Sequence, residues 1–272
     1  MPKTARRAAA AAAFAVVVAG VLTACEQQPV AAPAAGPVIT AIGEATSIPP
    51  PVEREPERQP VTQSAPVEVA ISFPRTGSGQ WMFTPGSDEV AGKSGRLMRY
   101  RIAVETDIDG VGPAEFAKDI RTILGDPRGW TAGGQWRLQQ VGPADMADFT
   151  LYLATPASRD KLCGGTPDSY TSCRNGSNVV LNVARWANAV PNYGAPLDIY
   201  RQYMVTHETG HRLGHGHELC PGPGRPAPVM EQQTLGLHGC VPNPWPFPDG
   251  GGSREYTGPP GEYDDPIPAG DS

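Results

Sequence analysis

Alternating apolar and polar positions mark the first strands that we expect in this chain. Val69, Ile71 and Phe73 alternate with other residues as in a half-buried strand, so an ordered domain is expected to begin near residue 67. The alternation resumes over residues 96–106, where one face is apolar and the other is charged. The apolar positions there are Met98, Tyr100, Ile102 and Val104. This second segment is predicted to be a strand with one face in the core.

A helical repeat and two further strands follow. Residues 113–124 begin with a proline at the first turn and repeat large apolar residues at helical spacing, namely Phe116, Ile120 and Ile123. Residues 136–141 and 149–154 then have the composition of strands. The order strand, helix, strand, strand predicts an α+β fold with a twisted mixed sheet and a helix on one face. Asn175-Gly176, a typical hairpin turn, separates two further candidate strands at residues 170–173 and 179–182.

A second helix is predicted over residues 197–213, with Pro196 well placed to begin it. Tyr200, Met204, His207 and His211 follow one another at intervals of four, three and four, so they lie along one stripe of this helix. Beyond Cys220 the chain is rich in proline, which predicts an irregular C-terminal subdomain.

Composition sets the domain boundaries. The 32 glycines and 31 prolines concentrate towards both ends of the 272 residues, and 39% of the chain is hydrophobic, as expected for one domain with flexible arms. We expect a Pro/Ala-rich tether at residues 25–66, one domain at 67–249 and a disordered tail at 250–272. An inhibitory propeptide is the alternative interpretation of the tether, but the tether has no cysteine after Cys25 to occupy a metal. The net charge of -6 and the lack of a basic cluster argue against a nucleic-acid partner.

The N-terminus has the features of an export signal. Lys3, Arg6 and Arg7 precede an uncharged, Ala- and Val-rich run, which ends in Leu22-Thr23-Ala24-Cys25. This tetrapeptide resembles the bacterial lipobox, and the resemblance implies a lipoprotein signal peptide at residues 1–24 and a lipid on Cys25. A simple signal peptide and an uncleaved anchor are the alternatives. The expected location is extracytoplasmic, either anchored in the cell membrane by lipid or secreted.

The other four cysteines support export. Cys163, Cys173, Cys220 and Cys240 are an even number in a chain bound for an oxidising compartment, so we expect disulfides. Of the three pairings, the nearest-neighbour one, Cys163 with Cys173 and Cys220 with Cys240, closes two short loops. A cysteine-rich metal site is the rival interpretation, but the chain has no CxxC pair.

The second helix carries a metal-binding motif, HExxHxxGxxH, formed by His207, Glu208, His211, Gly214 and His217. Two histidines four residues apart on a helix can reach one ion. Glu208, next to the first ligand, stands where a base that activates water belongs. Gly214 permits the left-handed turn that ends the helix and brings His217 from a loop. His215 is the competing third ligand, but the helix is expected to end before it. Three nitrogen ligands leave zinc an open, catalytic position.

This motif resembles the zinc-binding consensus of the metzincin metallopeptidases. The resemblance implies a zincin-like fold with zinc as cofactor. It also implies that Met230 is the methionine of a tight turn beneath the metal, and a buried Met in a Pro-rich loop is the alternative interpretation. Gln232 stands where several metzincins have a tyrosine that approaches the zinc. With the residues around Cys220 and Cys240, the chain also resembles a family of actinobacterial envelope proteins with predicted zincin sites.

The motif and the resemblance together predict an exported zinc metallopeptidase that hydrolyses peptide bonds, with Glu208 as general base. Its partners are then a peptide or protein substrate and, through Cys25, a membrane. The resemblance also implies that substrate lies extended along the sheet edge, for which residues 170–173 are the candidate. Two alternatives stay open: a zinc amidase acting on cell-wall peptides, and a zinc-binding envelope lipoprotein without catalysis.

Overall fold

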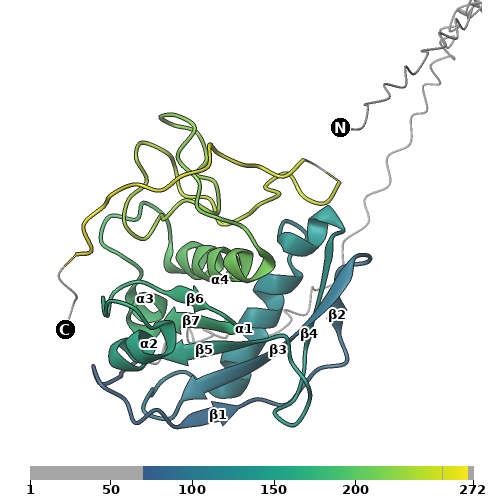
Figure 1. Ribbon diagram of the computed structural model, residues 1–272, viewed down its shortest axis with the longest axis vertical. Helices are drawn as coiled ribbons and strands as arrows, with labels where there is room; N and C mark the ends of the chain where they lie inside the picture. The colour runs from purple at the N-terminus through teal and green to yellow at the C-terminus, as the bar shows by residue number, and fades with distance from the viewer. Residues whose placement is uncertain (1–69, 253, 269–272) are drawn as a thin grey trace, which may run out of the picture. The chain divides into compact units, whose positions relative to one another are not determined.

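A computed structural model describes residues 70–252 and 254–268 of the chain. The strands of this part are β1 (Trp81–Phe83), β2 (Val90–Ala91), β3 (Arg96–Glu105), β4 (Trp136–Gln140), β5 (Phe149–Ala154), β6 (Cys173–Asn175) and β7 (Asn178–Asn182) (Figure 1). The helices are α1 (Pro113–Gly125), α2 (Pro156–Cys163), α3 (Val183–Asn188) and α4 (Leu197–Leu213), with a 3-10 turn at Trp130–Gly133.

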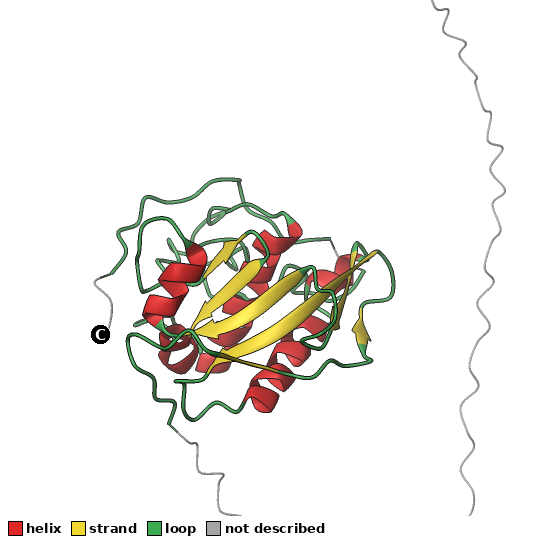
Figure 2. Ribbon diagram, turned by 60° about the horizontal axis from the view of Figure 1, so that its bottom comes forward, coloured by secondary structure: helices red, strands yellow, loops and turns green. Residues whose placement is uncertain are grey.

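The seven strands form one mixed sheet in the order β2-β4-β3-β5-β7-β6, with β1 also paired to β3. The pairs of β3 with β4, β3 with β5 and β5 with β7 are parallel, whereas β1, β2 and β6 pair antiparallel to their neighbours. Figure 2 shows the twist of this sheet and the helices packed along it. The predicted α+β fold with a mixed sheet is therefore confirmed, and β6 is the last strand on its side of the sheet.

The apolar face predicted for β3 is buried. One hydrophobic core contains the four apolar residues of β3 together with Phe116 and Ile120 of α1. The apolar residues of α4 belong to the same core. Burial of each large side chain contributes about 1.5–3 kcal/mol, so this face accounts for much of the stability of the domain. The helix that carries the motif histidines is thereby held in place, because α4 packs against α1, β6 and β7.

Helix α4 ends where the sequence predicts. Gly214 follows the last helical residue with φ of 106°, and its amide hydrogen bonds back to the carbonyl of His211. A side chain at this left-handed position would be strained, and for this reason glycine is favoured there. Beyond it the chain runs as loops on the side of α4 that faces away from the sheet (Figure 1). In the described residues, no helix is long and apolar enough to cross a membrane.

Two local expectations differ from the structure. Residues 70–73 form a single bridge, Ser72 with Asp109, instead of a strand, since Pro74 follows at once and β3 is already paired with β1. In the β6–β7 hairpin, Asn175 pairs with Asn178, so the two turn residues are Gly176 and Ser177, one position later than Asn-Gly. Gly176 has φ of 58°, and a glycine at the first turn position is typical of a tight hairpin.

The C-terminal residues are a third difference. Composition predicts disorder from residue 250, yet residues 254–268 hydrogen bond to the body of the domain. Tyr256, for example, donates its hydroxyl to the carbonyl of Pro226 at 2.9 Å. Pattern and composition miss this segment because it pairs through its backbone and a few polar side chains and has no apolar stripe of its own.

Candidate metal centre

The three motif histidines meet at one point. His207 and His211 lie one turn apart on α4 with their Nε2 atoms 3.1 Å apart, and the loop after Gly214 brings His217 Nε2 to 3.0 Å from His211 Nε2. In a tetrahedral zinc site, zinc–nitrogen bonds of about 2.0–2.1 Å place neighbouring nitrogens about 3.3 Å apart. The spacing of these atoms therefore fits an ion held by all three rings.

Each ring turns its other nitrogen to an acceptor. His207 Nδ1 lies 2.8 Å from the carbonyl of Val229, and His211 Nδ1 lies 2.9 Å from the carbonyl of His215. His217 Nδ1 lies 2.9 Å from a carboxylate oxygen of Glu262. Since these oxygens only accept, the proton of each neutral ring is on Nδ1, and three Nε2 lone pairs face one another. Three lone pairs that face one another repel unless a cation lies between the rings. Acceptors on the Nδ1 atoms are also the usual outer-shell partners of metal-bound histidines.

Burial keeps two of the rings in the form that binds metal. It lowers the pKa of His207 well below 6.5, with smaller contributions from the neighbouring histidines. It also lowers the pKa of His211 to about 4. Both rings are therefore neutral at neutral pH, with a lone pair free to coordinate.

Glu208 lies beside the three histidines but is not part of the group of side chains that could hold a metal ion. The residue is 6% exposed, and its Oε2 is buried with no hydrogen-bond partner among the described residues. Burial raises the pKa of Glu208 to about 8, against a smaller lowering by the positive charge of Arg159. A buried carboxyl oxygen without a hydrogen-bond partner costs free energy, and such groups are often found where a ligand or substrate binds.

Glu208 and the three histidines line a cavity of about 470 Å³. Residues 171–174, which lead into and form part of β6, make one wall, and residues 214–217 make another. Gln232, Thr234 and Leu235 from the C-terminal loops and Tyr203 from α4 complete the lining. The candidate centre thus lies in a recess between the sheet edge and the irregular part of the domain.

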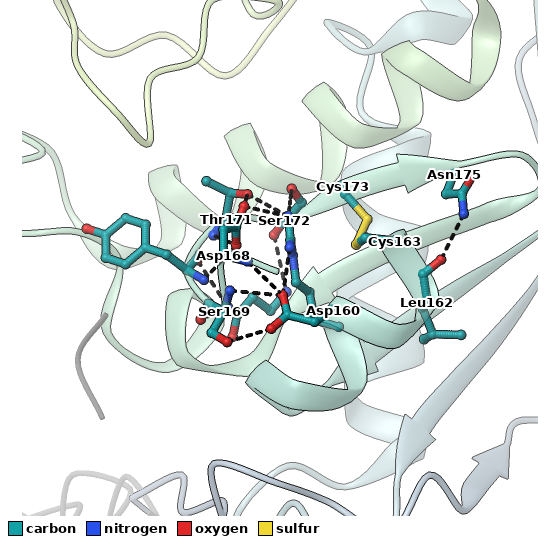
Figure 3. Close-up of a disulfide and its surroundings, with 12 residues drawn as sticks. Asp160, Leu162, Cys163, Asp168, Ser169, Thr171, Ser172, Cys173 and Asn175 are labelled. Atoms are coloured by element: carbon teal, nitrogen blue, oxygen red, sulfur yellow. Dashed lines mark hydrogen bonds and ion pairs between the residues drawn. A yellow bond between two sulfur atoms is a disulfide. The ribbon is translucent and has the colours of Figure 1, made fainter. Parts of the chain in front are cut away.

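The wall at the sheet edge is held in place by a disulfide and an ionic cluster (Figure 3). Cys163 at the end of α2 is bonded to Cys173 at the start of β6, as the nearest-neighbour pairing requires. Asp160 accepts hydrogen bonds from the backbone of Asp168 and from the backbone and hydroxyl of Ser169. The guanidinium of Arg159, which is 5% exposed, pairs with both aspartates at 2.9 and 2.8 Å. These contacts fix the loop that leads into the wall.

Met230 lies in a tight turn under α4. The amide of Glu231 donates to the carbonyl of Pro228 at 3.0 Å, which closes the turn, and Met230 is 1% exposed. A Cβ placed on Gly210 of α4 would lie only 2.5 Å from Met230 Sδ, so the thioether packs directly on the helix between the two motif histidines. The second disulfide, Cys220 with Cys240, encloses this turn, and with it the predicted pairing is confirmed.

The structure separates the two candidates for third ligand. His217 joins the triad, whereas the ring of His215 stacks on Trp130 at 4.1 Å between centroids. Cys25 lies outside the described residues. Sequence patterns missed Glu262 and the carbonyl of Val229, which hold two of the rings. No signal in the motif points to them, because they lie 45 and 22 residues from the histidines that they contact.

The fold and the triad define an α+β protein with a candidate three-histidine metal centre. A search of curated proteins found no match, and a search of solved structures found none either. Residues 68–240 match a protein-family model described as Protein of unknown function (DUF3152). The chain belongs to this family. The matched range contains the triad, Glu208 and Met230, and it ends before Glu262.

Proposed function

We propose that this protein is a zinc-dependent hydrolase that cleaves peptide bonds, with His207, His211 and His217 as the metal ligands and Glu208 as the general base. One observation carries the proposal. The Nε2 atoms of His207 and His217 lie 3.1 and 3.0 Å from Nε2 of His211, and a buried carboxyl, one of whose oxygens has no partner among the described residues, lies beside them in a cavity. A site that only stores metal needs the ligands but has no use for the carboxyl.

The donor set fits zinc, because neutral imidazoles are common ligands of this ion and three of them leave a fourth position open. When bound, zinc supplies Lewis acidity, which polarises a carbonyl and lowers the pKa of water. Glu208 accepts the proton of the attacking water on its carboxylate and then delivers it to the nitrogen of the leaving amine. Burial raises the pKa of Glu208 to about 8 in the metal-free protein, and the positive charge of a bound ion would lower this pKa and favour the carboxylate form that accepts a proton.

The surroundings of the site support a metzincin-like enzyme. The tight turn at Met230 lies under the ligand helix, as the resemblance of the motif implies. Strand β6 runs antiparallel to β7, ends the sheet and borders the cavity. An extended peptide adds to such an edge through backbone hydrogen bonds. We therefore propose that substrate binds beside residues 173–175, which corrects the expected edge of residues 170–173 by a few positions.

The test uses the full-length protein purified in detergent, a diverse peptide library and mass spectrometry. Wild type is expected to cleave peptides, and Glu208→Gln to lose at least a hundredfold in kcat while zinc content stays the same, since general base catalysis contributes about 10²–10⁴-fold. Glu115→Gln, which changes an exposed glutamate of α1, is the matched control. Equal cleavage by Glu208→Gln would disprove the role of Glu208. Zinc binding without any cleavage would favour the metal-binding lipoprotein, and cleavage of cell-wall peptides alone would favour the amidase.

We also propose that the protein acts outside the cytoplasm as a lipoprotein. The two disulfides support an oxidising compartment, and Leu22-Thr23-Ala24-Cys25 supports lipidation. Cys25→Ser is expected to move the protein from the membrane to the soluble fraction of cells. Unchanged membrane association of the variant would rule out the lipid anchor.

A further inference from the structure

The C-terminal tail, defined here as residues 254–268, runs along the loop that carries the third histidine. Glu218 and Pro260 form an antiparallel bridge. The amide of Leu219 donates to the carbonyl of Pro259 at 2.8 Å, and the amide of Gly261 donates to the carbonyl of His217 at 3.1 Å. The backbone of the tail is therefore paired with the ligand loop at His217 itself.

Further contacts fasten the tail on both sides of residue 262. Before it, the amide of Gly258 donates to the carboxylate of Glu218 at 3.0 Å. After it, the ring of Tyr263 stacks on His238 with centroids 3.4 Å apart, and Asp265 accepts from His238 Nε2 at 2.9 Å. Glu262 is thus held at a fixed place although its own side chain is largely exposed.

At that place Glu262 meets the candidate metal site. Its Oε2 lies 2.9 Å from His217 Nδ1. The corresponding nitrogens of His207 and His211 meet backbone carbonyls, which are neutral, whereas His217 meets a carboxylate. A charged acceptor forms the stronger hydrogen bond, and it increases the electron density that the ring offers through Nε2.

We propose that Glu262 is a positioning residue of the metal site and that the tail is part of that site. The carboxylate fixes the proton of His217 on Nδ1 and orients Nε2 towards the other two histidines. This inference rests on the proposed function in so far as it takes the triad to bind zinc. It adds a residue that lies beyond the range matched by the family model and that no motif contains.

The first experiment measures zinc affinity of the full-length protein by competition with a chromophoric chelator. Glu262→Ala is expected to weaken zinc binding about tenfold or more, the range found for outer-shell partners of ligands. Glu262→Gln is expected to lose less, because its amide oxygen still accepts from Nδ1. The matched control is Glu255→Gln on the same tail, since Glu255 faces the non-ligand His215 at 3.6 Å, and its affinity is expected to equal that of wild type.

The second experiment reads the tautomer of His217 in the zinc-free protein by nitrogen NMR with labelled histidine, of which the chain has five. Wild type is expected to carry the proton on Nδ1, and Glu262→Ala to shift towards protonation on Nε2. Equal zinc affinity and an unchanged tautomer in Glu262→Ala would overturn the inference while leaving the zinc site intact. Failure of wild type itself to bind zinc would instead overturn the proposed function, and this inference with it.

Discussion

Gly210 offers a test of how tightly the turn at Met230 packs under the candidate site. A Cβ at this position would lie 2.5 Å from Met230 Sδ and 2.6 Å from Cζ2 of Trp130. Neither neighbour can withdraw easily, because Met230 and Trp130 are 1% and 4% exposed. The indole N–H of Trp130 also donates to the carbonyl of Thr206 at 2.7 Å. Gly210→Ala must therefore displace the turn, the tryptophan or the helix.

Two opposing effects set the size of the change. Overpacking a well-filled core costs about 1–3 kcal/mol. Alanine is favoured over glycine inside a helix by about 0.8–1 kcal/mol, which offsets part of that cost. Gly210→Ala is therefore expected to lower the free energy of unfolding by about 1 kcal/mol. In a domain of this size, a change of about 1 kcal/mol lowers the melting temperature by about 2–4 °C. Without the close contact, the same substitution would raise stability.

Urea denaturation of the metal-free protein measures the effect and its sign. Gly216→Ala is the control, because a Cβ there meets no atom within 4 Å. In a Met230→Ala background, the cost of Gly210→Ala is expected to fall, since one of the two blocking atoms is gone. A more stable Gly210→Ala variant, or an equal cost in both backgrounds, would refute the packing of Met230 on α4.

Three further predictions concern pH, redox state and metal. Burial raises the pKa of Glu231 from 4.5 to about 8, so the protein is expected to lose stability as pH rises through this range. The urea midpoint should therefore fall less between pH 5 and pH 8.5 for Glu231→Gln than for wild type. An identical fall would show that Glu231 does not titrate there. Replacing either cysteine pair by serines should lower the free energy of unfolding by about 3 kcal/mol, measured in urea, whereas an unchanged midpoint would contradict bonded cysteines. Zinc at a hundred times its dissociation constant should add about 2.7 kcal/mol of stability that a chelator removes, and this gain should be absent in His211→Ala.

The elements that the sequence predicts well have one buried face in a regular pattern. Strand β3 and helices α1 and α4 each repeat large apolar residues at their own period, and each was found within one or two residues of its expected ends. Helix α2 has no such stripe, because its buried positions include Ser158 and Arg159, which serve a polar network. A pattern of apolar residues cannot reveal a helix that is held by hydrogen bonds and a disulfide.

The candidate site likewise has residues that the sequence predicts and others that it does not. The motif carries the three histidines and Glu208 within a short segment, where helical spacing and one glycine set the geometry. Two of the groups that orient the rings, Glu262 and the carbonyl of Val229, are distant in sequence from the histidines that they contact. The carbonyls of Val229 and His215 are backbone groups, which any residue type would provide. Glu262 is one of several acidic residues in a Gly/Pro-rich tail, so only the folded chain distinguishes it from its neighbours.

The pairing of the tail with the ligand loop has a consequence for the order in which the protein matures. A chain that is synthesised from its N-terminus offers His207 and His211 first, and Glu262 only 45 residues after His217 has been made. If the tail completes the site, a nascent chain that has not yet reached residue 262 holds an incomplete, weaker metal site. Full affinity then arises only once the tail has been made and has paired with the ligand loop, which favours loading with metal after synthesis of the domain and not during it.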